Sequence, residues 1–183
     1  MTFGILAYVI LAGYRHPFII LKSKQDVGGS NKMNPLVGIH VALGELGAIA
    51  FLWVFVELLD PTPARRKRAQ IVALVGTALL ISSWVVGGFY YVTYYGTNVK
   101  PVIKSGPQPW AHNVFMEVKE HVFLLLPFLA VVLNFLLFGV DPTKRRNKSS
   151  MLILSLAVFG LGMLMALLGF LISSGYRVGL GGV

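Results

Sequence analysis

The segment "DPTPARRKRAQ", Asp60 to Gln70, is a helix stop followed by a run of positive charge. A second segment of the same kind, "DPTKRRNKSS", spans Asp141 to Ser150. Proline cannot continue a helix, because its ring collides with the preceding turn and its nitrogen has no proton to donate. Lys and Arg beside hydrophobic helices lie in the headgroup layer of a membrane. Each segment is therefore predicted to be a short turn that joins two antiparallel helices.

Apolar runs flank both turns, and each is longer than the roughly 20 residues that a helix needs to cross a bilayer. The chain is 56% hydrophobic and only 13% charged, whereas soluble domains carry about 25% charged residues. Its mean hydropathy is +0.74. We predict an all-α integral membrane protein, with a four-helix transmembrane bundle over residues 34–177. The predicted spans are Pro35–Leu59, Gln70–Tyr95, Ala111–Val140 and Ser150–Gly175.

The remaining segments are assigned as follows. Residues 1–33 form an N-terminal hydrophobic segment and a polar loop; the apolar part is an extra span, an interfacial helix or an uncleaved signal anchor. Residues 96–110 contain three prolines and are predicted to be a surface loop. No water-soluble part is large enough for a Rossmann, P-loop or hydrolase domain. The absence of cysteine excludes disulfides, thiolate chemistry, Fe–S clusters and covalently attached haem.

The formal charge of +9 is concentrated at the two turns, in residues 65–68 and 144–148. This distribution is typical of a topology signal in a cell inner membrane, with the basic turns 64–68 and 144–148 on the cytoplasmic side. Anionic lipid headgroups are the expected partner, and nucleic acid is not. Aromatic residues at the opposite ends of the spans support this orientation.

The two hairpins resemble each other at a constant offset in the sequence. Asp60-Pro61-Thr62 aligns with Asp141-Pro142-Thr143, and His40 aligns with His121. We predict a tandem repeat of residues 34–95 and 115–176, related by a pseudo-two-fold axis along the membrane normal. The alternative is convergence of two basic turns.

The paired histidines would lie at one height on opposite helices, where two imidazoles could hold a planar metallomacrocycle. We therefore predict haem b with His40 and His121 as axial iron ligands. Gly44 and Gly47 would leave room for its flat face, and the Glu117 carboxylate would orient His121. The alternatives are a (bacterio)chlorophyll or no cofactor, with the glycines serving close helix contact.

An ionisable residue deep in a membrane span indicates function, because placing such a group in hydrocarbon costs free energy. This cost is highest for Glu45. It is predicted to be a proton or quinone site, or to pair with Lys119. His112 is assigned to the membrane interface, and Glu57 to a capping or interfacial charge.

The leading functional prediction is a b-type cytochrome-like electron-transfer subunit that works with other membrane or redox subunits and exchanges electrons with quinone. The alternative is a cofactor-free accessory subunit of a respiratory or photosynthetic complex, and a weaker one is a proton or ion carrier. Catalysis is expected only within such an oxidoreductase complex, because no nucleophile–base pair or phosphate loop is visible.

Overall fold

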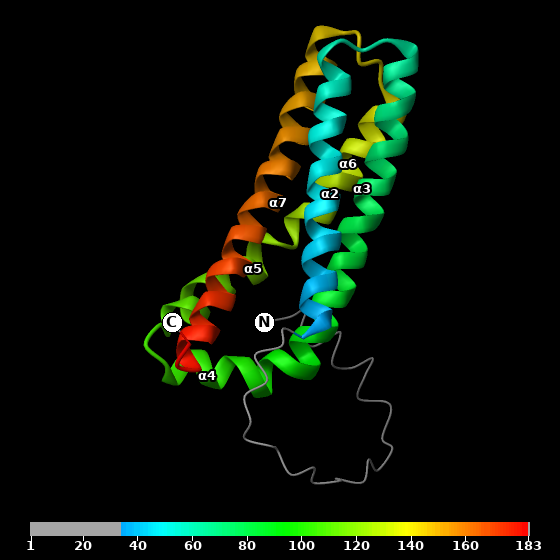
Figure 1. Ribbon diagram of the computed structural model, residues 1–183. Helices are drawn as coiled ribbons and strands as arrows, with labels where there is room; N and C mark the ends of the chain where they lie inside the picture. Colours follow the sequence, from blue (N-terminus) through cyan, green and yellow to red (C-terminus); the bar gives the residue numbers. More distant parts are fainter. Residues whose placement is uncertain (1–33, 183) are drawn as a thin grey trace. The chain divides into compact units, whose positions relative to one another are not determined.

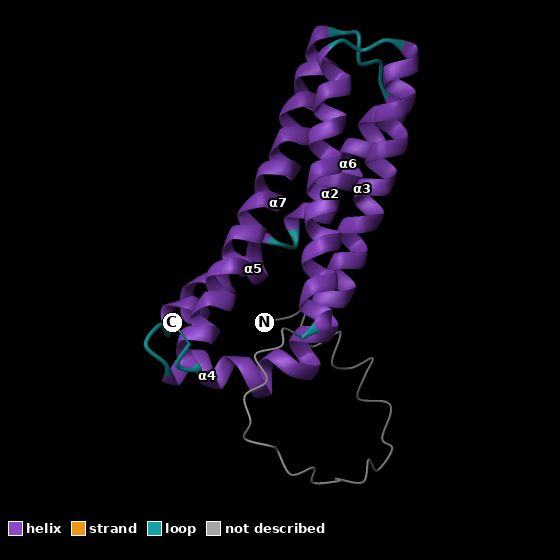
Figure 2. Ribbon diagram, viewed as in Figure 1, coloured by secondary structure: helices purple, strands orange, loops and turns teal. Residues whose placement is uncertain are grey.

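A computed structural model describes residues 34–182, which form helices and turns without any strand. The extra span predicted within residues 1–33 lies outside the described residues. The elements are α2 (Pro35–Leu59), α3 (Pro63–Tyr90), η1 (Tyr91–Val99), α4 (Lys100–Ser105), η2 (Ala111–Met116), α5 (Glu117–Val122), α6 (Leu125–Gly139) and α7 (Arg145–Gly179), where η marks a π-helical segment (Figures 1 and 2).

The described residues include four helical stretches that are long and apolar enough to cross a membrane. Their outward-facing side chains include many large apolar ones, such as Trp53, Phe135 and Ile153, which are 56%, 74% and 70% exposed. Water would penalise such a surface, whereas lipid would not. The prediction of an all-helical protein with four potential spans is confirmed, and its apolar faces indicate contact with lipid.

The Asp-Pro-Thr stop between α2 and α3 forms as the sequence predicts. Helix α2 ends at Leu59, two residues before Pro61, and α3 begins at Pro63. The Thr62 side chain accepts a hydrogen bond from the Arg65 backbone N–H and so caps the new helix. Proline at the first helical position has no unsatisfied N–H, so Pro63 favours the start of α3.

The loop predicted over residues 96–110 is mostly helical. Helix α3 runs directly into η1 and then into α4, and only residues 106–110 separate α4 from η2. Pro101 lies in the first turn of α4, where the missing N–H costs nothing. The prolines therefore start a helix at one position and form a turn at the others.

The third predicted span is divided. Helix α5 ends at Val122, a turn follows at Phe123 and Leu124, and α6 begins at Leu125. Pro127 explains the break, because it cannot donate to the Phe123 carbonyl and its ring crowds that group. The break changes the direction in which the α5 side chains point relative to those of α6.

Helix α2 packs against α3 and α7, and α6 packs against the same two helices, so the four long helices surround one core (Figure 1). Within this core the Asn134 side chain donates to Thr77 Oγ1 at 2.7 Å and to the Ala130 carbonyl at 2.9 Å. A polar contact between α6 and α3 is therefore built into an apolar interface. Fully buried core side chains include Phe51, Val54, Leu58, Leu133, Leu137, Met151 and Val158.

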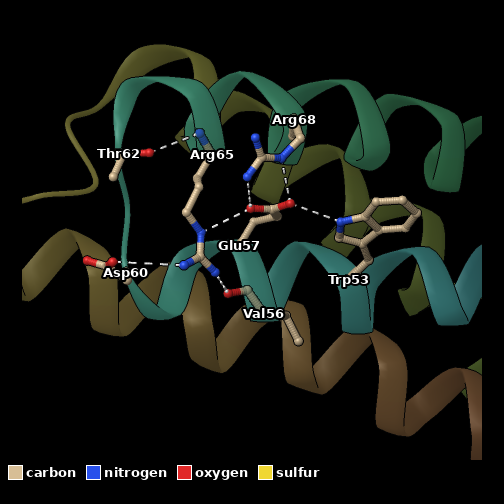
Figure 3. Close-up of polar contacts among 7 residues, drawn as sticks. All are labelled: Trp53, Val56, Glu57, Asp60, Thr62, Arg65 and Arg68. Atoms are coloured by element: carbon tan, nitrogen blue, oxygen red, sulfur yellow. Dashed lines mark hydrogen bonds and ion pairs between the residues drawn. The ribbon is translucent and has the colours of Figure 1, made fainter.

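Glu57 binds two basic side chains of the first turn (Figure 3). Its carboxylate accepts from Arg68 Nε at 2.8 Å, from Arg65 Nε at 3.1 Å and from the Trp53 indole N–H at 3.0 Å. Only 8% of the Glu57 side chain is exposed. The sequence assigned Glu57 to the end of its helix, but its role as the counter-ion of two arginines depends on the fold.

The two basic turns lie at the same end of the bundle, here called the basic end. Arg66 on α3 donates to the Leu137 carbonyl at 3.0 Å and to the Val140 carbonyl at 2.9 Å, at the C-terminus of α6. Lys148 on α7 donates to the Leu59 carbonyl at 2.6 Å, at the C-terminus of α2. Cations thus satisfy helix-terminal carbonyls that have no partner within their own helix.

Candidate functional site

A cleft with a mostly apolar lining and a few polar side chains lies on the other half of the bundle, where α2, α3, α5, α6 and α7 converge. Its cavity volume is about 50 Å³. Val41 and Glu45 at its rim are exposed, so the cleft opens to the surface of the bundle. The polar side chains that line it are His40, Glu45, Ser83 and Lys119.

Ser83 fixes the orientation of the His40 ring. The Nδ1 atom lies 2.8 Å from the Ser83 carbonyl oxygen, which can only accept, so Nδ1 carries the proton. Ser83 Oγ lies 2.9 Å from the same nitrogen and donates to the His40 carbonyl at 2.8 Å. In the neutral ring Nε2 is then left with a free lone pair.

Close helix contact presses the protonated edge of this ring against α3. A Cβ atom at Gly87 would come within 2.6 Å of His40 Nδ1 and 2.7 Å of Cε1. Any larger residue at this position would displace the imidazole. The Nδ1–Cε1 edge of the ring therefore faces α3, and His40 also lines the cleft.

Gly44 and Gly47 serve the α2–α3 contact. A Cβ at Gly44 would lie 3.1 Å from Ser83 Oγ, and one at Gly47 would lie 3.0 Å from the Leu80 side chain. Of the two, only Gly44 lines the cleft. The alternative that the sequence left open, glycines that allow close packing of two helices, describes both positions.

Lys119 brings a positive charge to the cleft from α5. Its Nζ lies 3.0 Å from the point that a Cβ of Gly169 on α7 would occupy, so this glycine makes room for the ammonium group. Glu45 lines the same cleft, but within residues 34–182 no ion pair joins it to Lys119. The two groups share a cavity without neutralising each other directly.

His121 lies elsewhere. Its side chain is exposed, it does not line the cleft, and its Nδ1 is 2.6 Å from the Glu117 backbone carbonyl. Glu117 thus contacts His121 through its backbone carbonyl and not, as predicted, through its carboxylate. The short helix α5 and the break after it set this direction, which the sequence alone did not reveal.

The structure brings only one of the two predicted haem ligands to the cleft. His40 lines it and His121 does not. A site that uses both imidazoles would require α5 to be placed differently.

A second polar pair lies in the π-helical segments. The Tyr95 hydroxyl and His112 Nδ1 are 2.9 Å apart, and both residues are 2% exposed. The Tyr91 and Tyr95 rings stack with their centroids 5.2 Å apart. His112 is thus buried against Tyr95, and its assignment to the membrane interface stays a prediction.

The fold and the cleft define an all-helical protein with four potential membrane spans and a polar site between them. Comparisons with protein-family models, with curated proteins and with solved structures found no match.

Proposed function

We propose that this chain is a membrane subunit whose polar cleft binds the head group of a quinone-type electron carrier. The observation that carries the proposal is the convergence of His40 and Lys119 on one cleft. A quinol hydroxyl can donate to the free lone pair of His40 Nε2, and a quinone carbonyl can accept from the Lys119 ammonium group. The pair thus suits both oxidation states of such a ligand.

Access supports a ligand that arrives from the bilayer. The rim residues Val41 and Glu45 are exposed, so a ring could enter sideways between helices. The cavity of about 50 Å³ is too small for a ring, so the proposal places the head group at the open mouth of the cleft. Glu45 at this rim is placed to exchange protons with the ligand.

The same proposal covers the orientation of the chain in the membrane and its partner subunits. The basic turns would lie on the cytoplasmic side of a cell inner membrane, which puts the cleft in the outer leaflet. In this proposal the chain would work beside other membrane or redox subunits. The tandem repeat and its pseudo-two-fold axis remain predictions.

The proposal is tested by photolabelling the detergent-solubilised full chain with an azido-quinone, followed by peptide mapping. Labelling is expected on peptides of α2 and α5. Replacement of His40 or Lys119 by Gln should weaken competition by unlabelled quinone about ten- to a hundredfold, because a hydrogen bond to a charged or polar ligand group is lost. His121→Gln is the matched control, since its exposed ring leaves the cleft untouched.

Equal labelling of the His40→Gln and Lys119→Gln variants and of the unaltered chain would contradict the proposal. Failure of labelling in all of them, with no spectral cofactor, would favour the cofactor-free accessory subunit. If the chain is instead a proton or ion carrier, it should transport protons or ions, and that transport should depend on Glu45.

Haem b remains a second candidate because of one observation. Both His40 and His121 have Nδ1 against a backbone carbonyl, an arrangement that leaves Nε2 for a metal. Haem or a (bacterio)chlorophyll would give the purified protein a visible absorption band. A haem b band that shifts on reduction and is lost in both His40→Ala and His121→Ala would establish it, and a featureless spectrum would exclude it.

A further inference from the structure

The basic end carries cations that the fold does not use. Arg65 and Arg68 pair with Glu57, and Arg66 and Lys148 bind helix-terminal carbonyls. The other basic side chains of the two turns are exposed and, within residues 34–182, have no hydrogen-bond or ion-pair partner; they are Lys67, Lys144, Arg145 and Arg146.

Three of these cations are consecutive at the start of α7, and no carboxylate of residues 34–182 lies within 4 Å of them. The position that aligns with Glu57 is Phe138, which is 53% exposed. The acid of this turn, Asp141, accepts from the Thr143 N–H at 2.9 Å and from its hydroxyl at 2.8 Å. No cation of residues 34–182 lies within 4 Å of its carboxylate.

We infer that Lys144, Arg145 and Arg146 form a binding surface for the phosphate headgroup of an anionic membrane lipid. The inference is independent of the quinone proposal. Unneutralised positive charge attracts an anion, and these residues precede the apolar part of α7 by less than two helical turns. The exposed Phe138 ring on α6 offers apolar contact to an acyl chain, which a free phosphate lacks.

The geometry of the neighbouring turn favours the same ligand. A hollow between the two turns is lined by residues of both, among them Pro61, Arg66, Asp141 and Thr143, so a second basic segment stands beside the start of α7. Arg66 is held there by its bonds to α6 and adds to the positive field, which the Asp141 carboxylate partly offsets.

The test titrates the full chain in detergent with fluorescent phosphatidylglycerol and, separately, with fluorescent phosphatidylcholine. The unaltered protein should prefer the anionic lipid. The triple variant Lys144→Gln/Arg145→Gln/Arg146→Gln should lose at least about tenfold in affinity for phosphatidylglycerol, because each basic residue near an anionic headgroup contributes about fivefold. Its affinity for phosphatidylcholine should not change.

A matched control removes the same amount of charge at the other end of the bundle. Lys100→Gln/Lys104→Gln/Arg177→Gln should bind phosphatidylglycerol within about twofold of the unaltered chain. The single variant Arg145→Gln, expected to lose about fivefold, keeps the test decisive if the triple variant misfolds.

Unchanged affinity in the triple variant, or equal loss in the control, would overturn the inference. Displacement of the lipid by millimolar inorganic phosphate, as effective as displacement by unlabelled phosphatidylglycerol, would also overturn it, because the site would then be one for a free anion.

Discussion

The two basic turns begin with the same Asp-Pro-Thr sequence, but their basic side chains differ in whether they find partners within the fold. In the first, Glu57 is buried beside Arg65 and Arg68 and forms ion pairs with both of them within the fold. In the second, Phe138 occupies the aligned position, and Lys144 to Arg146 face outward without partners among the described residues. One acidic residue near the end of a helix thus decides whether a basic run stabilises the fold or remains available to an external anion.

The largest effect on stability is expected from Glu57→Gln. The change removes the charge that two arginines share, and it should lower the free energy of unfolding by about 2 kcal/mol. A fully buried pair would cost more, but the arginines are partly exposed and can be rehydrated. Reversible unfolding in mixed detergent micelles, followed by circular dichroism, measures the difference.

Asp60→Asn is the control for this change. Asp60 is 84% exposed in its side chain and 3.9 Å from Arg65, so its loss should cost less than about 0.5 kcal/mol. Equal losses for both variants would mean that Glu57 is not the counter-ion that distinguishes the first turn.

The contact between the turns is probed by Arg66→Gln. It removes charged hydrogen bonds to the Leu137 and Val140 carbonyls, and a loss of about 1.5 kcal/mol is expected. The same unfolding measurement applies, with Lys67→Gln as control, because the Lys67 side chain is exposed and has no partner among residues 34–182. If Lys67→Gln lowered the free energy of unfolding as much as Arg66→Gln does, the loss of charge alone, and not of the carbonyl contact, would be responsible.

Phe138→Glu would give the second turn the acid that it lacks. The carboxylate should pair with Arg146, which aligns with Arg65, and so reduce the affinity for anionic lipid about fivefold. The lipid titration described above measures this, with Phe138→Gln as the neutral control. An increase in affinity would show that the two turns differ in geometry as well as in composition.

The smallest effect concerns pH. Hydrogen bonds from the Thr143 N–H and hydroxyl lower the pKa of Asp141 below its ordinary value. The resulting stabilisation is present above the unfolded-state pKa and is lost as the pH falls through the lower folded-state pKa. Unfolding of the unaltered chain and of Asp141→Asn, compared at neutral and acidic pH, should show a difference that shrinks on acidification. A difference that grows on acidification would contradict this assignment.

The helical class, the four potential spans and the proline stops could be predicted from the sequence because their causes are local. Span length follows from the thickness of hydrocarbon, and Pro61 ends a helix regardless of its surroundings. The break at Pro127 has an equally local cause, but it was hidden inside a long apolar run. The helical segment over residues 96–105 was not predicted, because Pro101 within it and two prolines after it suggested a loop.

For the candidate site, the sequence predicted some of the residues but not which of them lie together. The sequence assigned His40 and Gly44 to a haem site and Glu45 to a proton or quinone site, and all three line one cleft of the structure. It paired His40 with His121, whereas the fold brings Lys119 to the cleft.

The sequence by itself determined that this chain is a bundle of apolar helices joined by short turns with basic runs, because hydrophobicity and proline geometry act within a few residues. Only the tertiary structure decided which polar side chains meet. A side chain's direction depends on the rotation of its helix about its own axis, and packing at Gly87 and Gly169 together with the break before α6 sets that rotation.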